Sequence, residues 1–140
     1  MSTRGAATRG SCLCRSIQYE VSGEPKRFTH CHCRRCRKAS GTGHASNLFA
    51  KPGTIKWIKG EELIQSYKVP DAKRFTSRFC SVCGSQVPRY VKETDFFVIP
   101  AGSLDSDPML QPQARAFRDS RASWSCSGDD IPVHSEYATS

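Results

Sequence analysis

The sequence lacks any long apolar run, and this absence limits where the chain can work. No segment approaches the roughly 18 consecutive apolar residues that a membrane-spanning helix needs. The first residues, MSTRGAATRGS, do not contain the apolar stretch of a secretory signal. We therefore expect a cytoplasmic protein that has no membrane partner.

Aromatic and acidic residues are also scarce. Only 9% of the residues are aromatic and 37% are hydrophobic, which predicts a small apolar core for 140 residues. The 21 basic residues outnumber the 13 acidic ones, and the formal net charge of +8 favours anionic ligands. The basic stretches contain no interleaved aromatic residues that would stack on bases, so nucleic acid is not the expected partner.

Long helical patterns are missing too, because Gly and Pro divide the chain into short segments. In residues 16–21 apolar and polar side chains alternate with the period of a half-buried strand. Comparable segments predict strands at 47–50, 54–58, 63–69, 75–79, 87–91, 96–99 and 113–117. One helical turn is predicted over Arg34–Ser40, ending at Gly41. The pattern predicts an all-β fold of packed sheets.

The length of the chain suits one domain, and its composition suggests where that domain begins and ends. We expect a flexible N-terminus over residues 1–9 and the folded domain over residues 10–118. Residues 119–140 are polar and are interrupted by Gly128 and Pro132. We expect them to form a C-terminal tail that either frays or packs on the domain.

Cysteine, in contrast, is abundant. Eight cysteines in a chain without an export signal indicate metal binding rather than disulfides, because the cytosol keeps thiols reduced. Seven of the eight lie in close clusters, as metal ligands do: Cys12 and Cys14, then Cys31, Cys33 and Cys36, then Cys80 and Cys83. Cys126 is separate from the others.

The first and last clusters favour a closed site of four thiolates around zinc. Cys12 and Cys14 are two residues apart, so both sulfurs point to the same side of an extended segment. Cys80 and Cys83 form a CxxC pair followed by Gly84, a knuckle that turns around a metal ion. Zinc at these four residues would close a long loop that a small core could not easily close.

The middle cluster, HCHCRRC at residues 30–36, favours an open site. Three thiolates on zinc leave a fourth position for water or substrate, which is the arrangement of a catalytic site. His30 and His32 alternate with the cysteines, so an extended backbone would direct them to the opposite face. We therefore regard them as weak candidates for the same metal ion.

Two alternatives remain at this point. Cys126 or a histidine could fill the fourth position and make the middle site structural. The cysteines could also be divided differently, with Cys33 and Cys36 joining Cys80 and Cys83 in a zinc ribbon. That division leaves three cysteines unused, although they are spaced as ligands.

Four motifs, in this order, resemble the glutathione-dependent formaldehyde-activating enzyme (GFA) family, which includes centromere protein V. The motifs are Gly10–Cys14, Cys31–Gly41, Phe79–Ser85 and Ala101–Asp105, and they span most of the chain. The resemblance implies the β-tent fold of that family, in which packed antiparallel sheets are stapled by zinc. One difference is Arg15, which stands where the family usually has glycine.

The resemblance also implies two zinc ions and divides the ligands between them. The structural ion would be held by Cys12, Cys14, Cys80 and Cys83. The catalytic ion would be held by Cys31, Cys33 and Cys36, and no catalytic residue is expected beyond this open zinc site.

The implied activity is that of a carbon–sulfur lyase, which condenses glutathione with formaldehyde to S-hydroxymethylglutathione or reverses this step. An open zinc site can acidify a thiol or polarise an aldehyde oxygen. Arg34, Arg35 and Lys38 lie close to the middle cysteines in sequence and are candidates for binding the carboxylates of glutathione. The alternative is a non-catalytic zinc module that binds a protein or nucleic acid.

Overall fold

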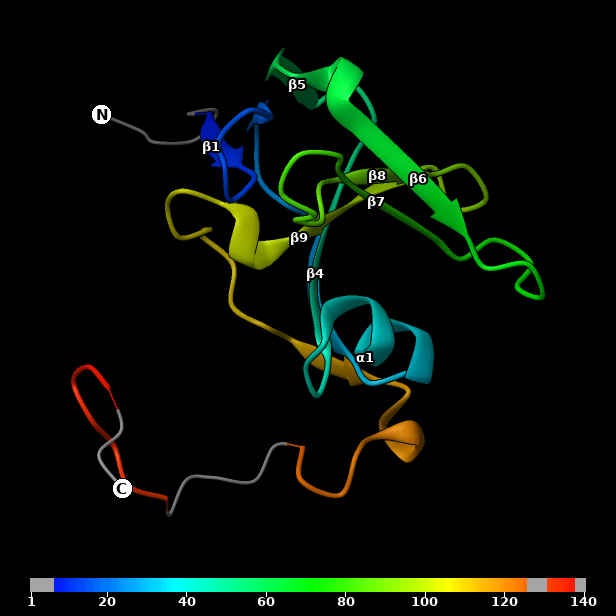
Figure 1. Cartoon of the computed structure of the whole chain (residues 1–140), viewed down its shortest axis with the longest axis vertical. Helices are drawn as coiled ribbons and strands as arrows, with labels where there is room; N and C mark the ends of the chain where they lie inside the picture. Colours follow the sequence, from blue (N-terminus) through cyan, green and yellow to red (C-terminus); the bar gives the residue numbers. More distant parts are fainter. Residues whose placement is uncertain (1–6, 126–130, 138–140) are drawn as a thin grey trace.

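The structure is a computed structural model, and it describes residues 7–125 and 131–137. Short strands and the loops between them make up most of the described chain, as Figure 1 shows. The mainly β fold predicted from the sequence is therefore confirmed. Among the described residues, no helix has both the length and the apolar character needed to cross a membrane.

A sheet of five strands lies at the centre, in the order β10–β3–β4–β9–β8. Its strands are β3 (Arg27–Cys31), β4 (Ala45–Ala50), β8 (Arg89–Val91), β9 (Phe96–Pro100) and β10 (Ala114–Ala116). All neighbours are antiparallel except β10, which pairs in parallel with β3. The sheet is thus mixed, and not purely antiparallel as expected. The long connection that leads from β3 to β10 permits this parallel pairing, which a short hairpin would not.

Two smaller sheets accompany the central one. The first contains β1 (Thr8–Ser11), β2 (Gln18–Val21) and β5 (Ile55–Lys59), and the second is the hairpin of β6 (Ile64–Lys68) and β7 (Thr76–Cys80). β1 begins two residues before the expected domain boundary.

Four short helices complete the described fold. Helix α1 (Arg34–Ser40) stops before Gly41, as the sequence predicted, and Gly41 forms a left-handed cap with a φ of 74°. Three single-turn 3-10 helices are η1 (Glu61–Leu63), η2 (Ala101–Ser103) and η3 (Arg118–Ser120).

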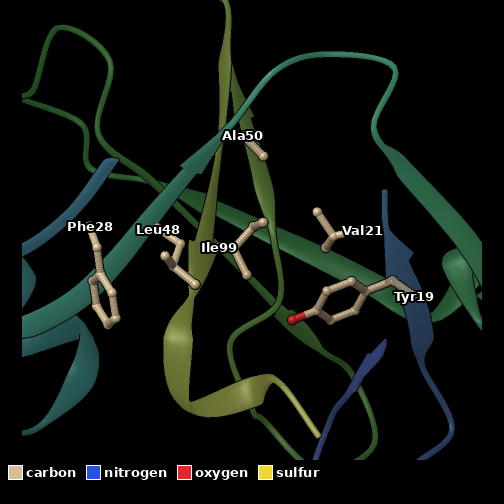
Figure 2. Close-up of a cluster of buried hydrophobic side chains, with 6 residues drawn as sticks. All are labelled: Tyr19, Val21, Phe28, Leu48, Ala50 and Ile99. Carbon is tan, nitrogen blue, oxygen red and sulfur yellow. The ribbon is translucent and has the colours of Figure 1, made fainter. Parts of the chain in front are cut away.

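The larger apolar cluster joins β2 to the central sheet. Figure 2 shows Ile99 between the side chains of Leu48 and Tyr19, with Phe28 beyond Leu48. The buried hydroxyl of Tyr19 has a partner, Ser103 Oγ, at 2.5 Å. Burial raises the pKa of Tyr19 to about 12.

A second buried cluster contains Cys12, Ile17, Cys80 and Val87. Two cysteines of the predicted closed site are thus part of the core. The core and this candidate metal site are therefore one packed unit.

Candidate metal centres

The structure brings the four sulfurs of the first candidate site together. Cys12 and Cys14 lie between β1 and β2, whereas Cys80 ends β7 and Cys83 lies in the turn that follows. Their Sγ atoms all lie within 4.8 Å of one another, with 3.7 Å between Cys12 and Cys14 and 3.9 Å between Cys14 and Cys80. Thiolates bound tetrahedrally at about 2.3 Å from zinc would be about 3.8 Å apart. The two distances of 3.7 and 3.9 Å match this spacing, and all four sulfurs are close enough to share one ion.

Backbone N–H groups surround these sulfurs. The amide of Ile17 donates to Cys12 Sγ at 3.3 Å, and that of Val82 donates to Cys80 Sγ at 3.3 Å. Hydrogen bonds of this kind stabilise the thiolate form that binds metal. Gly84 N donates to Cys80 O at 2.8 Å with a φ of 79°, which explains why glycine follows the CxxC pair.

The pKa values of these thiols diverge. Burial raises the pKa of Cys12 to about 11, whereas hydrogen bonds with Ser85 lower the pKa of Cys83 to about 5. Hydrogen bonds with Ser16 also lower the pKa of Cys14. A metal ion favours the thiolate, so cation binding would offset the cost of deprotonating the buried Cys12. The donor set fits a thiophilic divalent cation.

The three sulfurs of the second candidate site converge at the start of α1. Cys31 ends β3, Cys33 is the N-cap of α1, and Cys36 lies in its first turn. Their Sγ atoms lie within 4.8 Å of one another, and Cys36 N donates to Cys33 Sγ at 3.3 Å. Cys31 and Cys36 are buried, whereas Cys33 is partly exposed. Cys33 is therefore the accessible member of the cluster.

The half-buried guanidinium of Arg89 faces this second cluster. Burial lowers the pKa of Arg89, and the charges of Cys36, Cys31 and Cys33 oppose that change. A hydrogen bond with Cys36 is the main cause that lowers the pKa of Cys31 to about 6, and the charge of Arg89 contributes. The same interaction and burial raise the pKa of Cys36. Three neighbouring thiolates repel one another, so the thiols resist losing all their protons together. A divalent cation would offset this repulsion, and the cluster therefore also fits such a cation.

The histidines of the middle motif lie apart from its sulfurs. His30 stacks on His44 with ring centroids 3.9 Å apart, and Ser125 Oγ lies 3.2 Å from Nδ1 of the buried His32. Among the described residues, neither sulfur cluster includes a histidine. This agrees with the opposite face that their alternation with the cysteines indicates.

The zinc-ribbon alternative disagrees with the structure. Cys33 and Cys36 belong to one cluster, and Cys80 and Cys83 belong to the other. Cys126, the alternative fourth thiolate of the middle site, lies outside the described residues.

The residues predicted to bind carboxylates, Arg34, Arg35 and Lys38, are all exposed on α1. Their role stays a prediction. Arg89, which was not predicted as a site residue, lines a small cavity next to Cys36 with room for about one water molecule. A single arginine in a strand gives no signal of its own, and only its packing position shows that it faces the sulfurs.

The fold and the two sulfur clusters define a mainly β protein with two candidate metal centres. Residues 7–120 match the family model described as glutathione-dependent formaldehyde-activating enzyme, and the chain belongs to this GFA family. A crystal structure of a Rhodobacter sphaeroides protein is similar, with a TM-score of 0.58 and 18% sequence identity, over 77% of this chain and 98% of the other. That similarity shows a shared fold. A search of curated proteins finds no match.

Proposed function

We propose that this protein is a zinc-dependent carbon–sulfur lyase of the GFA type. Its substrate would be an adduct of an aldehyde with glutathione or another thiol, such as S-hydroxymethylglutathione. The observation that carries the proposal is the cluster of Cys31, Cys33 and Cys36, which has three sulfurs where the first cluster has four. Membership of a family named for glutathione and formaldehyde supports the same substrate class.

The two clusters would have different tasks. Cys12, Cys14, Cys80 and Cys83 would hold a structural zinc ion that stabilises the fold. Zinc held by Cys31, Cys33 and Cys36 would supply Lewis acidity toward a thiol or an aldehyde oxygen.

The chemistry needs no further reactant. In the synthetic direction the thiol sulfur forms a bond to the aldehyde carbon, and the thiol proton is transferred to the carbonyl oxygen. Cleavage reverses both changes.

The residues of this chain would provide the electrostatic setting for that step. The guanidinium of Arg89 offsets part of the negative charge of three thiolates. The exposed cations Arg34, Arg35 and Lys38 on α1 would attract the carboxylates of glutathione.

The test is to measure how fast formaldehyde, glutathione and their adduct interconvert, by 13C exchange NMR with zinc-loaded protein. We expect the wild type to accelerate exchange and Cys33→Ser to lose the acceleration while staying folded. A wild-type protein with two bound zinc ions and only the uncatalysed rate would contradict the proposal.

One observation favours a second candidate function, a zinc-stabilised module that binds a polyanion or an acidic protein. The formal net charge is +8, more than the proposed chemistry requires. Micromolar binding of duplex DNA at 150 mM salt, together with no exchange activity, would favour this candidate.

A further inference from the structure

A strongly basic pocket lies beside the second cluster, and metal binding does not explain it. It has a volume of about 240 Å³ and lies between the β6–β7 hairpin and β8. Five cationic side chains and one acidic side chain line it: Lys68, Lys73, Arg74, Arg89, Lys92 and Glu93. Pockets that enclose a whole drug-sized ligand are larger, roughly 300–1,000 Å³. This pocket therefore suits one end of such a ligand.

The positive charges in this basic pocket are not neutralised by the protein. Across residues 7–125 and 131–137, the recorded ion pair joins Arg9 to Glu20, so no pocket cation is paired with Glu93. A concave surface with several unpaired charges of one sign concentrates ligands of the opposite sign. The pocket therefore favours a ligand with more than one anionic group.

Two of the cations are held in place. Lys68 Nζ donates to Ala72 O at 2.7 Å, which fixes the ammonium group at the base of the hairpin loop. The guanidinium of Arg89 lies 5.1 Å from the ring centroid of Phe75. Lys73, Arg74 and Lys92 are exposed and accessible to a ligand.

Arg89 connects the basic pocket to the second cluster. It lines the pocket, and it also lines the small cavity that contains Cys36. Its charge acts on all three sulfurs of the cluster. Arg89 therefore forms a wall that the basic pocket shares with the cavity beside Cys36.

We propose that the basic pocket binds the carboxylate end of an anionic thiol substrate, whose sulfur reaches the cluster of Cys31, Cys33 and Cys36. This inference rests on the proposed function and adds to it a binding site for the charged end of the substrate, a thiol with more than one carboxylate. Guanidinium and ammonium groups bind carboxylates through charge-assisted hydrogen bonds. The hairpin and β8, in addition to α1, would then select the substrate.

The test separates carboxylate binding from thiol chemistry by using S-methylglutathione, which keeps both carboxylates but cannot form a thiolate. Its affinity for the zinc-loaded, full-length protein is measured by calorimetry. We expect the double variant Lys73→Glu/Arg74→Glu to bind at least about tenfold more weakly than the wild type. The matched control Lys56→Glu/Lys59→Glu changes the net charge equally at exposed positions of β5, and we expect its affinity to stay within about twofold.

A second measurement tests the metal site independently. In cobalt-substituted protein, the neutral thiol 2-mercaptoethanol should shift the absorption spectrum equally in the wild type and in Lys73→Glu/Arg74→Glu. No shift in the wild type would overturn the proposed function while leaving the S-methylglutathione result to report on the pocket. No binding of S-methylglutathione to the wild type, or equal weakening by both double variants, would overturn the pocket assignment.

Discussion

Arg15 has a backbone conformation that L-amino acids adopt at a cost. Its φ is 66°, in the loop that carries Cys12 and Cys14, and its side chain is exposed. The left-handed region costs a residue with a Cβ roughly 1–2 kcal/mol, whereas glycine adopts it readily. The positive φ therefore explains why glycine suits this position better than the arginine found here.

Arg15→Gly should therefore stabilise the protein. Glycine loses more chain entropy on folding, so we expect a net gain of about 0.5–1 kcal/mol in the free energy of unfolding. Urea unfolding at a fixed excess of zinc measures it. The control is Lys56→Gly, an exposed position in β5 without a positive φ, which should destabilise the protein. If Arg15→Gly destabilises the protein as Lys56→Gly does, the backbone of Arg15 is not strained.

Tyr19 makes stability depend on pH at the alkaline end. Its pKa is about 12 in the folded state and near 10 when unfolded, because burial disfavours the phenolate. The folded state thus retains the proton more strongly. The stabilisation is complete below pH 10 and is lost as the pH rises through 12, a change of roughly 2–3 kcal/mol.

Tyr19→Phe should remove this dependence. At pH 8 the variant loses the hydrogen bond to Ser103 and should be less stable by about 1 kcal/mol. Between pH 10 and 12 the wild type should lose its advantage and become the less stable protein. Urea unfolding at several pH values, compared between the two proteins, measures this difference. Parallel stability curves would show that Tyr19 does not titrate in this range.

At the scale of elements, the sequence predicted eight of the strands from β2 onward and the helix α1, because alternation, Gly and Pro mark them. It missed β1 and β3. β1 (TRGS) contains no large apolar residue, so it carries no alternating pattern. β3 (RFTHC) ends in the ligand motif, where cysteine and histidine obscure the pattern. The parallel pairing of β10 with β3 depends on a distant contact that no local pattern reveals.

The candidate sites were predictable to a similar extent. The cysteines were found because ligands of one metal recur at short spacings, and each predicted group of sulfurs lies together in the structure. The basic pocket was missed because β6, β7 and β8 supply its cations from distant parts of the sequence. Tertiary packing, rather than spacing, brings Lys73 and Lys92 to one surface.

Cys80 and Cys33 lie in different surroundings, so we expect the loss of each ligand to affect the protein differently. Cys80 is fully buried at the end of β7, in contact with the second apolar cluster, whereas Cys33 is partly exposed at the start of α1. Cys80→Ser should destabilise the protein by several kcal/mol, because structural metal binding contributes directly to folding. Cys33→Ser should stay folded and lose exchange activity. Thermal melting followed by circular dichroism measures both, and similar melting of the two variants would contradict the division of roles.

For the whole molecule, the two clusters differ in how much of the chain they connect. The first joins residues 12 and 14 to residues 80 and 83, and so links the first sheet to the hairpin. The second spans only residues 31–36. Closing the longer loop costs more entropy and constrains more of the molecule. Metal loss from the first cluster should therefore affect the entire fold, whereas loss from the second should act locally.

The fourth position of the second site decides whether a substrate thiol can bind its metal ion. If the site is open, Cys126 is not a ligand, and Cys126→Ala should keep two zinc ions per chain. A fourth thiolate from Cys126 would close the site and leave no position for a substrate thiol. Elemental analysis gives the zinc content, and cobalt substitution followed by glutathione titration reports whether a thiol binds the metal. We expect unchanged zinc content and a glutathione-dependent spectral shift in both the variant and the wild type. Loss of one zinc ion from Cys126→Ala, with no shift in the wild type, would identify two structural sites and favour the binding module, because neither metal ion would then have room for a substrate.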